Sequence, residues 1–572
     1  MDIYKRYKGI KVNKMAFGDE LELMMIIKED YDKDCGEQTR GDNQKDTKDN
    51  PHSNLPINNT TTPYTSIYKL YCGSENVIGK TPFSFVEYAR YMVETSTLIP
   101  FNENSIDTVE ENILMRINEI HKSLPKNVDL IMIPCFFNLK FKNFYDTVPL
   151  VDDVTYSLNF PFNGITRHKR FVSFTENIRN RRGRKIEGYV EIMRDKKTKE
   201  KSILIDSMGQ GMGCCGLQIT IQGKTIKDTK YLYDMMGVFA PLGLRLSRGT
   251  PLASGRLLKS ETRWEMLEMS VDCRKDYEKS NGCNVRRDEG CKVEGNSKNE
   301  GKGKVDNSSK NIKNTLPSSP PSNLYIPKSR FSPIDYFISD HQNFNLDYND
   351  IYAPLNKRAY SKLRKEKVDK KISKHVSSLF VRDPMVSYSD VNEGEDEGSD
   401  ESKEDDINPN NNPHDTTNTL TYLKNDQISF THTDDFENIQ SSNWRSVRFK
   451  IPTENAPPDL GGWKVELRSM DIQATVFENT ALIYLSFLLS EAVLLFDLNL
   501  YIPISLIDEN FKRANAFIKD PKDYKEIKLK EDDQKLYYRR NVLSKGRPEI
   551  REGTLREIFL GDCEDGEGSK WG

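Results

Sequence analysis

A chain of 572 residues with a formal net charge of −3 has no global basic field, which argues against nucleic acid or an anionic membrane as its partner. Its nine Cys form no CxxC pair and its seven His form no HExxH pattern. We therefore expect reduced thiols in a cytoplasmic protein, without a disulfide framework or a structural zinc. The beginning, MDIYKRYKGIKV, lacks the apolar region of a secretory signal.

The stretch AFGDELELMMII (16–27) predicts a strand that brings two carboxylates onto one face. Side chains alternate along a strand, so Glu20 and Glu22 share one face while Leu21 and Leu23 share the other. The apolar run that follows indicates a buried strand, where unpaired carboxylates are costly. A divalent metal ion between them would remove that cost; a solvated edge strand is the commoner use of paired Glu and stays open.

Two further acids lie in TPFSFVEYARYMVE (81–94), which predicts a second strand. Glu87 and Glu94 are seven residues apart and would face opposite ways on one ideal strand. A bulge or a turn near Met92 is needed to bring the two carboxylates together.

Three segments predict helices. In 105–124 isoleucines recur at helical spacing, with Ser105 as a candidate N-cap. The segment 227–246 has a stripe of Leu, Met and Phe at the same spacing. The run ALIYLSFLLSEAVLLF (481–496) approaches membrane length, but it is short for a span and carries Glu491, so we expect a buried core helix.

Three segments, 30–63, 279–323 and 391–418, are poor in large apolar residues, and the last contains the acidic run EGEDEGSDESKEDD. They cannot bury enough apolar area to offset the entropy of ordering. We expect disordered insertions there.

The segment RFVSFTENIRNRRGRK (170–185) ends in a basic cluster that includes Arg182. A nuclear-localisation or nucleic-acid patch, a solvated loop and a phosphate contact beside metal-holding acids all stay open.

The segment SILIDSMGQGMGCCGLQITIQ (202–222) predicts a strand, a Gly-rich turn and a second strand. Its GxGxG is followed by a strand, which argues against a dinucleotide fold. Gln218 and Thr220 share one face of the second strand, and polar alternation beside a Gly turn is typical of a site-lining strand. Cys214 and Cys215 are residues that more often fill small spaces than react.

The segment SETRWEMLEMSVDCR (260–274) predicts another strand, beginning near Arg263 and Trp264. An unpaired buried guanidinium would be costly, so Arg263 needs a carboxylate partner. That partner is either a substrate or an internal acid such as Glu261 or Asp272.

In GGWKVELRSMDIQATVFEN (461–479), Glu466 and Arg468 share one strand face. A carboxylate and a guanidinium in this arrangement can hold a metal and a phosphate side by side. An ordinary cross-strand ion pair is the alternative.

These motifs closely resemble, in order, those of the eukaryotic glutamate–cysteine ligase catalytic subunit family. They are GDELE (18–22), VEYARYMVE (86–94), RFVSFTENIRNRRG (170–183), IDSMGQGMGCCGLQITIQ, TRWEMLEMSVDCR, PKSRFSPIDYFIS (327–339), SLFVRDP (378–384), FENIQSSNWRSVRFKIP and GWKVELRSMDIQATVFEN. The resemblance implies ATP- and Mg²⁺-dependent ligation of the γ-carboxyl of L-glutamate to the amine of L-cysteine through γ-glutamyl phosphate, the first step of glutathione synthesis. It also implies an α+β fold like that of glutamine synthetase, with a curved antiparallel sheet forming an active-site funnel and helices outside.

By position, the resemblance implies a set of acidic ligands for two or three Mg²⁺ ions: Glu20, Glu22, Glu87, Glu94 and Glu466. It implies that Arg468, together with Glu466, is catalytic and contacts the transferred phosphate, with Arg182 as a second contact to ATP. It assigns the amino-acid substrates to Arg263, Trp444, Cys215 and Gln218.

The resemblance makes 1–520 one catalytic domain interrupted by the insertions, and 521–572 a short remnant of the family's helical C-terminal part. The family's SRY motif is SRF here, so Phe331 lacks a hydroxyl near the cysteine substrate. A modifier subunit is a candidate partner. A related carboxylate–amine ligase and a C-terminally truncated homologue with low or no activity stay open as alternatives.

Overall fold

The computed structural model describes residues 2–29, 67–139, 144, 154–194, 198–279, 325–382, 384–386, 434–452, 457, 459–516, 534–543 and 548–561. The three predicted insertions lie outside the described residues, apart from Lys279.

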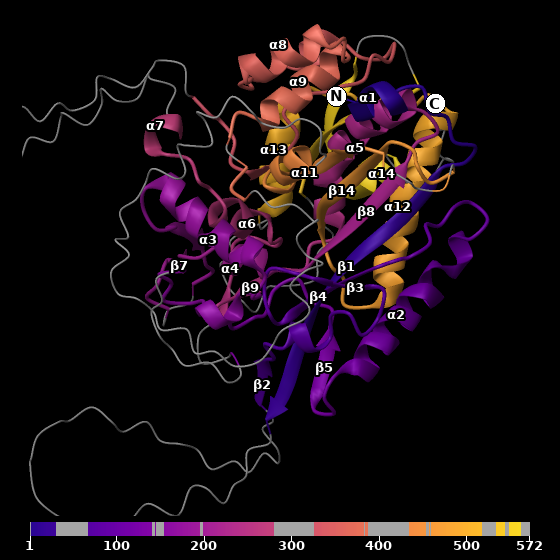
Figure 1. Cartoon of the computed structure of the whole chain (residues 1–572). Helices are drawn as coiled ribbons and strands as arrows, with labels where there is room; N and C mark the ends of the chain where they lie inside the picture. The colour runs from indigo at the N-terminus through magenta and orange to yellow at the C-terminus, as the bar shows by residue number, and fades with distance from the viewer. Residues whose placement is uncertain are drawn as a thin grey trace, which may run out of the picture.

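An open antiparallel sheet of eight strands lies at the centre of the molecule (Figure 1). The strand order is β13-β14-β8-β1-β4-β3, and β2 and β5 also pair with β1. The strands are β1 (Ala16–Glu29), β2 (Ile67–Leu70), β3 (Ser84–Val86), β4 (Met92–Ser96), β5 (Val128–Ile131), β8 (Gly216–Gln222), β13 (Val447–Lys450) and β14 (Lys464–Asp471). The α+β class is therefore confirmed.

The strand predicted over 16–27 is confirmed as β1, which pairs with four other strands. The strand predicted over 81–94 is two strands, β3 and β4, separated by residues 87–91. Within this break Ala89 bridges to Ile165. The required turn is thus present, before Met92, and it lets Glu87 and Glu94 reach the same face.

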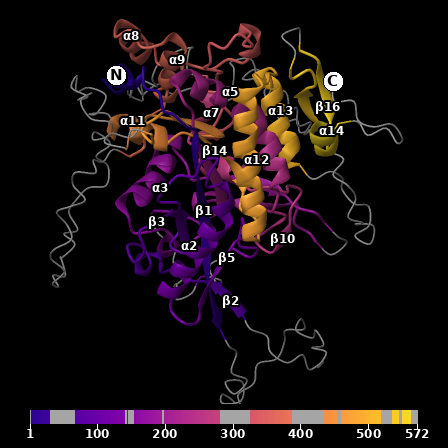
Figure 2. The ribbon, with the colours of Figure 1, turned by 90° about the vertical axis from the view of Figure 1, so that its right-hand side faces the viewer.

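Helices cover the sheet, as Figures 1 and 2 show. They include α2 (Val109–Ser123), α5 (Ile226–Leu246), α12 (Val476–Leu495) and α13 (Ile504–Asn515). The predicted helices in 105–124 and 227–246 are confirmed as α2 and α5. Ser105 precedes a short 3-10 turn (Ile106–Thr108) and makes no side-chain capping hydrogen bond, and Thr108 holds the N-cap position of α2.

The other α-helices and strands of the described residues are as follows. The helices are α1 (Asp2–Tyr7), α3 (Lys169–Arg182), α4 (Gly209–Met212), α6 (Trp264–Ser270), α7 (Asp276–Lys279), α8 (Lys357–Lys365), α9 (Lys370–Leu379), α11 (Asp434–Ser441) and α14 (Leu555–Leu560). Two-stranded pairs are formed by β6 (Gly188–Glu191) with β7 (Ser202–Ile205), β9 (Leu252–Ala253) with β10 (Arg256–Leu257), β11 (Phe331–Ser332) with β12 (Trp444–Arg445), and β15 (Leu536–Arg539) with β16 (Ile550–Gly553).

The helix predicted over 481–496 is confirmed as α12, but its burial is only one-sided. Phe487 is fully buried and stacks on Phe17 with ring centroids 4.1 Å apart, whereas Leu488 and Leu495 are exposed. By length and composition α12 could cross a membrane, and 39% of its most apolar window is buried inside the protein. A helix that packs one face against a protein core can have the same length and apolar composition.

Two predicted segments have a different structure. The strand expected over 260–274 is the helix α6, because Trp264, Leu267 and Ser270 are buried at helical spacing rather than in alternation. The basic segment 170–185 is not a loop but the helix α3, which ends at Gly183 with φ of 78°.

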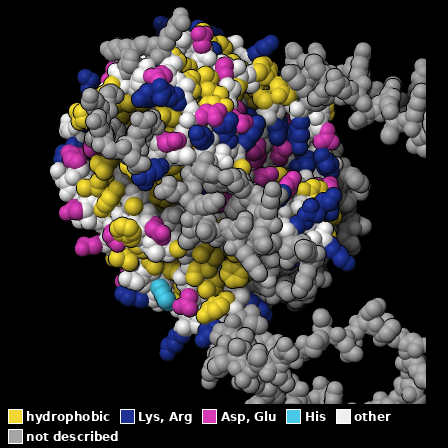
Figure 3. All heavy atoms as spheres, turned by 180° about the vertical axis from the view of Figure 1, so that it is seen from behind, with side chains coloured by type: hydrophobic (Ala, Val, Ile, Leu, Met, Phe, Trp, Pro, Cys, Tyr) yellow, Lys and Arg dark blue, Asp and Glu magenta, His cyan; other side chains and the backbone are white. Residues whose placement is uncertain are grey.

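Residues beyond 520 that the structure describes form the β15–β16 hairpin and α14. Asn510 of α13 holds β15 through its side chain, since its Nδ2 donates to Tyr537 O (2.8 Å) and its Oδ1 accepts from Tyr537 N (2.7 Å). On the face seen in Figure 3, acidic and basic side chains are interspersed, in keeping with the small net charge.

Candidate active site

The register of the sheet places the predicted acids on one face. Glu22 on β1 lies directly opposite Glu94 on β4, and Glu20 lies opposite Gln218 on β8. On the other side of β8, Glu466 of β14 lies opposite Thr220. Directly opposed residues of neighbouring strands point to the same face, so the sheet itself brings these side chains together.

Three carboxylates form the tightest group, which we name the acid triad: Glu22, Glu87 and Glu94. One oxygen from each lies within 4.8 Å of the other two. In the part of the chain that the structure describes, no Lys, Arg or His lies within ion-pair distance of these three residues. The acid triad is therefore a concentration of negative charge without a protein cation against it.

Burial and neighbouring carboxylates disfavour the charged forms of Glu22 and Glu94. Burial, followed by the charge of Glu87, raises the pKa of Glu22 to about 7, although Arg263 acts in the opposite direction. Burial, followed by Glu20 and Glu87, raises the pKa of Glu94 well above its ordinary range. A bound cation would reverse both shifts.

Gln218 completes the surroundings of the acid triad. Its Nε2 donates to Glu22 Oε1 (2.9 Å), and the backbone N–H of Gly216 donates to Glu22 Oε2 (2.6 Å). The remaining amide oxygen, Gln218 Oε1, is buried and has no hydrogen-bond partner. Carboxylates and a neutral carbonyl oxygen are the ligands that Mg²⁺ prefers, so these residues fit a divalent cation.

Glu466 has the opposite environment. Three cations contact its carboxylate: Arg468 Nη1 at 2.6 Å, Lys450 Nζ at 2.9 Å and Arg448 Nη1 at 3.3 Å. Burial alone would raise its pKa, but Arg448, Lys450 and Arg468 together lower it well below its ordinary range. We name these three residues the cation group.

Glu20 lies between the two groups. Its carboxylate is 3.7 Å from Lys450 Nζ, and burial raises its pKa even though Lys450 opposes the shift. Of the five acids predicted to bind metal, Glu22, Glu87 and Glu94 converge, whereas Glu20 and Glu466 lie within ion-pair distance of Lys450.

A small cavity opens beside the acid triad. Its lining residues are Glu22, Glu87, Met212, Cys214, Gln218, Arg263, Leu267, Phe331, Trp444 and Arg468. The cavity, about 30 Å³ in volume, joins acids, two arginines and an apolar wall.

Comparisons with known proteins show the family of this chain. The sequence model of the glutamate–cysteine ligase family matches residues 1–408 and 419–569. This chain belongs to the glutamate–cysteine ligase family. It is 30% identical to the Schizosaccharomyces pombe glutamate–cysteine ligase over 565 residues, which cover 93% of this chain and 68% of that protein. The Candida albicans enzyme is 30% identical over 575 residues, covering 91% and 74%. The human glutamate–cysteine ligase catalytic subunit is 30% identical over 452 residues, covering 75% and 59%.

In this member of the glutamate–cysteine ligase family, Arg263 has an internal partner that the sequence did not indicate. Its Nε lies 3.3 Å from Asp471 Oδ1, and its Nη2 donates to Met470 O (3.1 Å). The two internal acids considered from the sequence pair elsewhere: Glu261 lies 2.6 Å from Arg245, and Asp272 lies 2.8 Å from Arg274. Arg263 also lines the small cavity, and its role as a substrate ligand stays a prediction.

Of the other predicted substrate residues, Trp444 and Gln218 line the small cavity and Cys215 does not. Trp444 lines the cavity and packs edge-on against Phe174, with ring centroids 5.6 Å apart. Cys215 is fully buried, and burial raises its pKa well above the ordinary range. The neighbouring Cys214 lines the cavity in its place.

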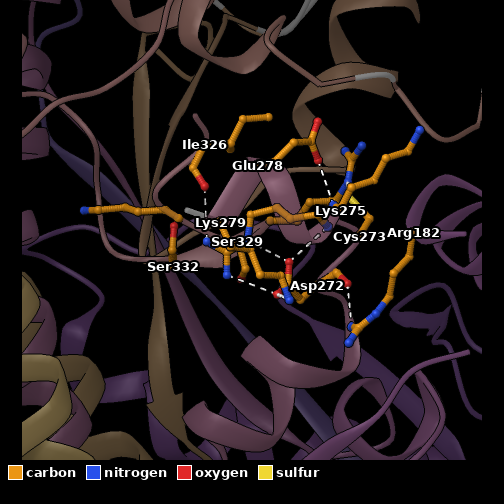
Figure 4. A network of polar contacts seen from close by, with 12 residues as sticks. Arg182, Asp272, Cys273, Lys275, Glu278, Lys279, Ile326, Ser329 and Ser332 are labelled. Atoms are coloured by element: carbon orange, nitrogen blue, oxygen red, sulfur yellow. Dashed lines mark hydrogen bonds and ion pairs between the residues drawn. The ribbon is translucent and has the colours of Figure 1, made fainter. Parts of the chain in front are cut away.

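Arg182 does not line the small cavity beside the acid triad. Its guanidinium donates to the backbone carbonyl of Asp272 (2.9 Å) and to that of Glu187 (3.4 Å). Figure 4 shows it beside the loop that follows α6, in a network where Arg181 pairs with Glu278. This end of the basic cluster ties α3 to α6 and α7.

Arg448 and Lys450 were missed by the sequence reasoning. The signal was present, because alternation along VRFK puts both side chains on one face of β13. The pairing of Arg448 with Glu466 across β13 and β14 could not be read without the register.

Proposed function

We propose that this chain ligates the γ-carboxyl of L-glutamate to the amine of L-cysteine, with ATP as co-substrate, as the first step of glutathione synthesis. The observation that carries the proposal is the acid triad lying on the same sheet face as a cation group, within a chain of the glutamate–cysteine ligase family. Joining a carboxylate to an amine through ATP needs both kinds of charge in one place.

Mg²⁺ is the cation that the acid triad and Gln218 Oε1 would hold, with Glu20 at its edge. When bound there, it would neutralise phosphate oxygens of ATP and allow two anions to approach. The fit rests on converging carboxylates with raised pKa values and on an amide oxygen left without a partner.

The cation group supplies the positive charge for the phosphates. Arg448, Lys450 and Arg468 all contact Glu466, and Lys450 also lies 3.7 Å from Glu20. Arg468 also lines the small cavity, so it would lie between the phosphates and the amino-acid substrate. A guanidinium held this way can bind two phosphate oxygens at once.

The small cavity is the proposed amino-acid site. Arg263 would bind the substrate carboxylate, and Trp444, Phe331 and Leu267 would exclude water from the reacting atoms. In the first step, an oxygen of the glutamate γ-carboxylate attacks the γ-phosphorus of ATP and ADP leaves. In the second, the cysteine nitrogen attacks the carbonyl carbon of γ-glutamyl phosphate, and phosphate leaves as the amide forms.

The finer fold assignment is also part of the proposal. A face of the sheet that carries the acids of β1, β4 and β14 and is bordered by loops supports a funnel of the glutamine-synthetase type. A modifier subunit is a proposed partner because the human relative is named a catalytic subunit.

The test is ADP release from the full chain supplied with ATP, Mg²⁺, glutamate and cysteine, with each omitted in turn. We expect ADP only when ATP, Mg²⁺ and glutamate are present, and γ-glutamylcysteine only when cysteine is added. Equal turnover with unrelated amines in place of cysteine would support a different carboxylate–amine ligase. ADP release that does not depend on glutamate would overturn the proposal.

A further inference from the structure

A second, larger hollow lies on the other side of α6 from the small cavity. It has a volume of about 880 Å³ and is bordered by β6, α6, the C-terminal half of α13 and the segment around 325–333. Residues Arg263 and Leu267 line the small cavity, whereas Trp264, Glu265 and Glu268 line this cleft. Since residues four apart share a helix face, α6 separates two distinct hollows.

The lysines of the cleft are already matched by acids. Lys328 Nζ lies 2.6 Å from Asp508 Oδ1, and Lys259 Nζ lies 3.4 Å from Glu191 Oε2. Lys512 is largely exposed and lies 3.8 Å from Glu509. Because each lysine already lies near an acid, we do not infer an anion site from these lysines.

Two carboxylates of the cleft lack such a partner. Glu268 has no hydrogen bond or ion pair in the part of the chain that the structure describes, and Glu265 receives only the neutral Nδ2 of Asn515 (3.2 Å). Burial raises the pKa of Glu268 to about 7; Arg274 and Lys328 oppose the shift, whereas Asp272 and Glu265 add to it. A partly buried carboxylate without an ion-pair partner lowers the stability of the folded state.

Aromatic rings form the rest of the wall. Tyr325 and Tyr352 stack with ring centroids 5.9 Å apart and an interplanar angle of 17°. Trp264 lies deeper, between Phe331 (4.4 Å) and Phe511 (4.2 Å). Aromatic faces beside carboxylates are the surroundings that attract an ammonium or guanidinium group.

We propose that this cleft binds a small organic cation, an amine or guanidine whose charged end lies between Glu265 and Glu268 and whose carbon chain lies against Tyr325 and Tyr352. The volume accommodates a molecule of the size of a polyamine or larger. The site is separate from the acid triad and does not depend on the proposed function.

Isothermal titration calorimetry tests the proposal, with putrescine as the probe and butane-1,4-diol as its neutral counterpart. The full chain is used with saturating Mg²⁺ at about pH 8, where the Glu268 carboxylate is largely charged. We expect a saturable one-site isotherm with putrescine and none with the diol. Glu94→Gln should leave that isotherm unchanged, which separates the cleft from the acid triad.

Glu268→Gln should weaken putrescine binding by about tenfold or more, the loss expected for one hydrogen bond to a charged group. Without ligand, the same variant should melt at or above the wild-type temperature, because it removes a carboxylate that the fold does not compensate. Glu119→Gln is the matched control, since Glu119 lies on α2 and pairs with Lys122 at 2.6 Å. It should change neither quantity. Absence of saturable putrescine binding, equal binding of the diol, or unchanged affinity in Glu268→Gln would overturn the proposal.

Discussion

The acid triad and Glu466 share one sheet and one chemical type, yet their surroundings are opposite. Glu22, Glu87 and Glu94 face one another with no cation within ion-pair distance among the described residues, and the pKa values of Glu22 and Glu94 are raised. Glu466 touches three cations, and its pKa is lowered. The difference teaches that equal residue types on neighbouring strands need not serve one ion. Among the described residues, the acid triad has no cation within ion-pair distance, whereas Glu466 has three.

The most disruptive test of this comparison is Glu466→Gln. It should reduce turnover by at least about a hundredfold, near 3 kcal/mol of transition-state stabilisation. It should also destabilise the fold by about 3 kcal/mol, because Arg448, Lys450 and Arg468 lose a carboxylate that all three contact. Turnover assays and urea denaturation measure the two effects. Wild-type turnover at saturating Mg²⁺ would remove Glu466 from the active site.

Glu94→Gln should have the same effect on turnover and the opposite effect on stability. We expect a loss of about a hundredfold in turnover. Without metal, the variant should be at least as stable as the wild type, since it removes repulsion from Glu20 and Glu87. Denaturation with a chelator present is the measurement. A fold weakened as much as by Glu466→Gln would erase the distinction between the two regions.

The comparison also predicts a pH dependence. Because the pKa of Glu22 is raised from 4.5 to about 7, the folded protein keeps a proton that the unfolded chain has released in this range. Stability of the metal-free protein should therefore fall between about pH 4.5 and pH 7 and level off above, by about 1–3 kcal/mol. Glu22→Gln should flatten that slope in denaturation curves recorded across this range, whereas a wild-type slope in the variant would contradict the assignment.

Arg263→Lys should have a smaller effect. A lysine point charge cannot keep the fork that contacts Asp471 and Met470 and also present a second edge to a substrate. We expect the KM for the amino-acid substrate to rise about tenfold, or about 1.4 kcal/mol, while the KM for ATP moves little. Measuring both KM values and the melting temperature separates the roles: destabilisation with unchanged KM values would leave Arg263 a purely structural role.

The smallest effect is expected from the insertion at 391–418, whose composition is acidic and polar. Replacing it by a short Gly/Ser linker should leave melting temperature and turnover nearly unchanged, because loop length costs only about 0.6 kcal/mol per doubling. Loss of soluble protein on replacement would show that this segment packs on the domain.

The sequence predicted the local features of the site better than its pairings. Alternation placed Glu20 with Glu22 and Glu466 with Arg468, because period two is a local property of strands. The partner of Arg263 lies 208 residues away at Asp471, and two of the cations around Glu466, Arg448 and Lys450, come from the neighbouring strand β13, so neither pairing has a local signal. The helix α6 was mistaken for a strand because a short apolar run is ambiguous between the two periods.

The central claim is that the acid triad is a cation site, and Mg²⁺-dependent melting without nucleotide tests it most directly. At about pH 8 the carboxylates are least compatible with one another, so added Mg²⁺ should raise the wild-type melting temperature in a saturable way. Glu94→Gln should lose most of this response, whereas Glu119→Gln should keep it. An equal response to Mg²⁺ in all three proteins, or none in the wild type, would contradict the account.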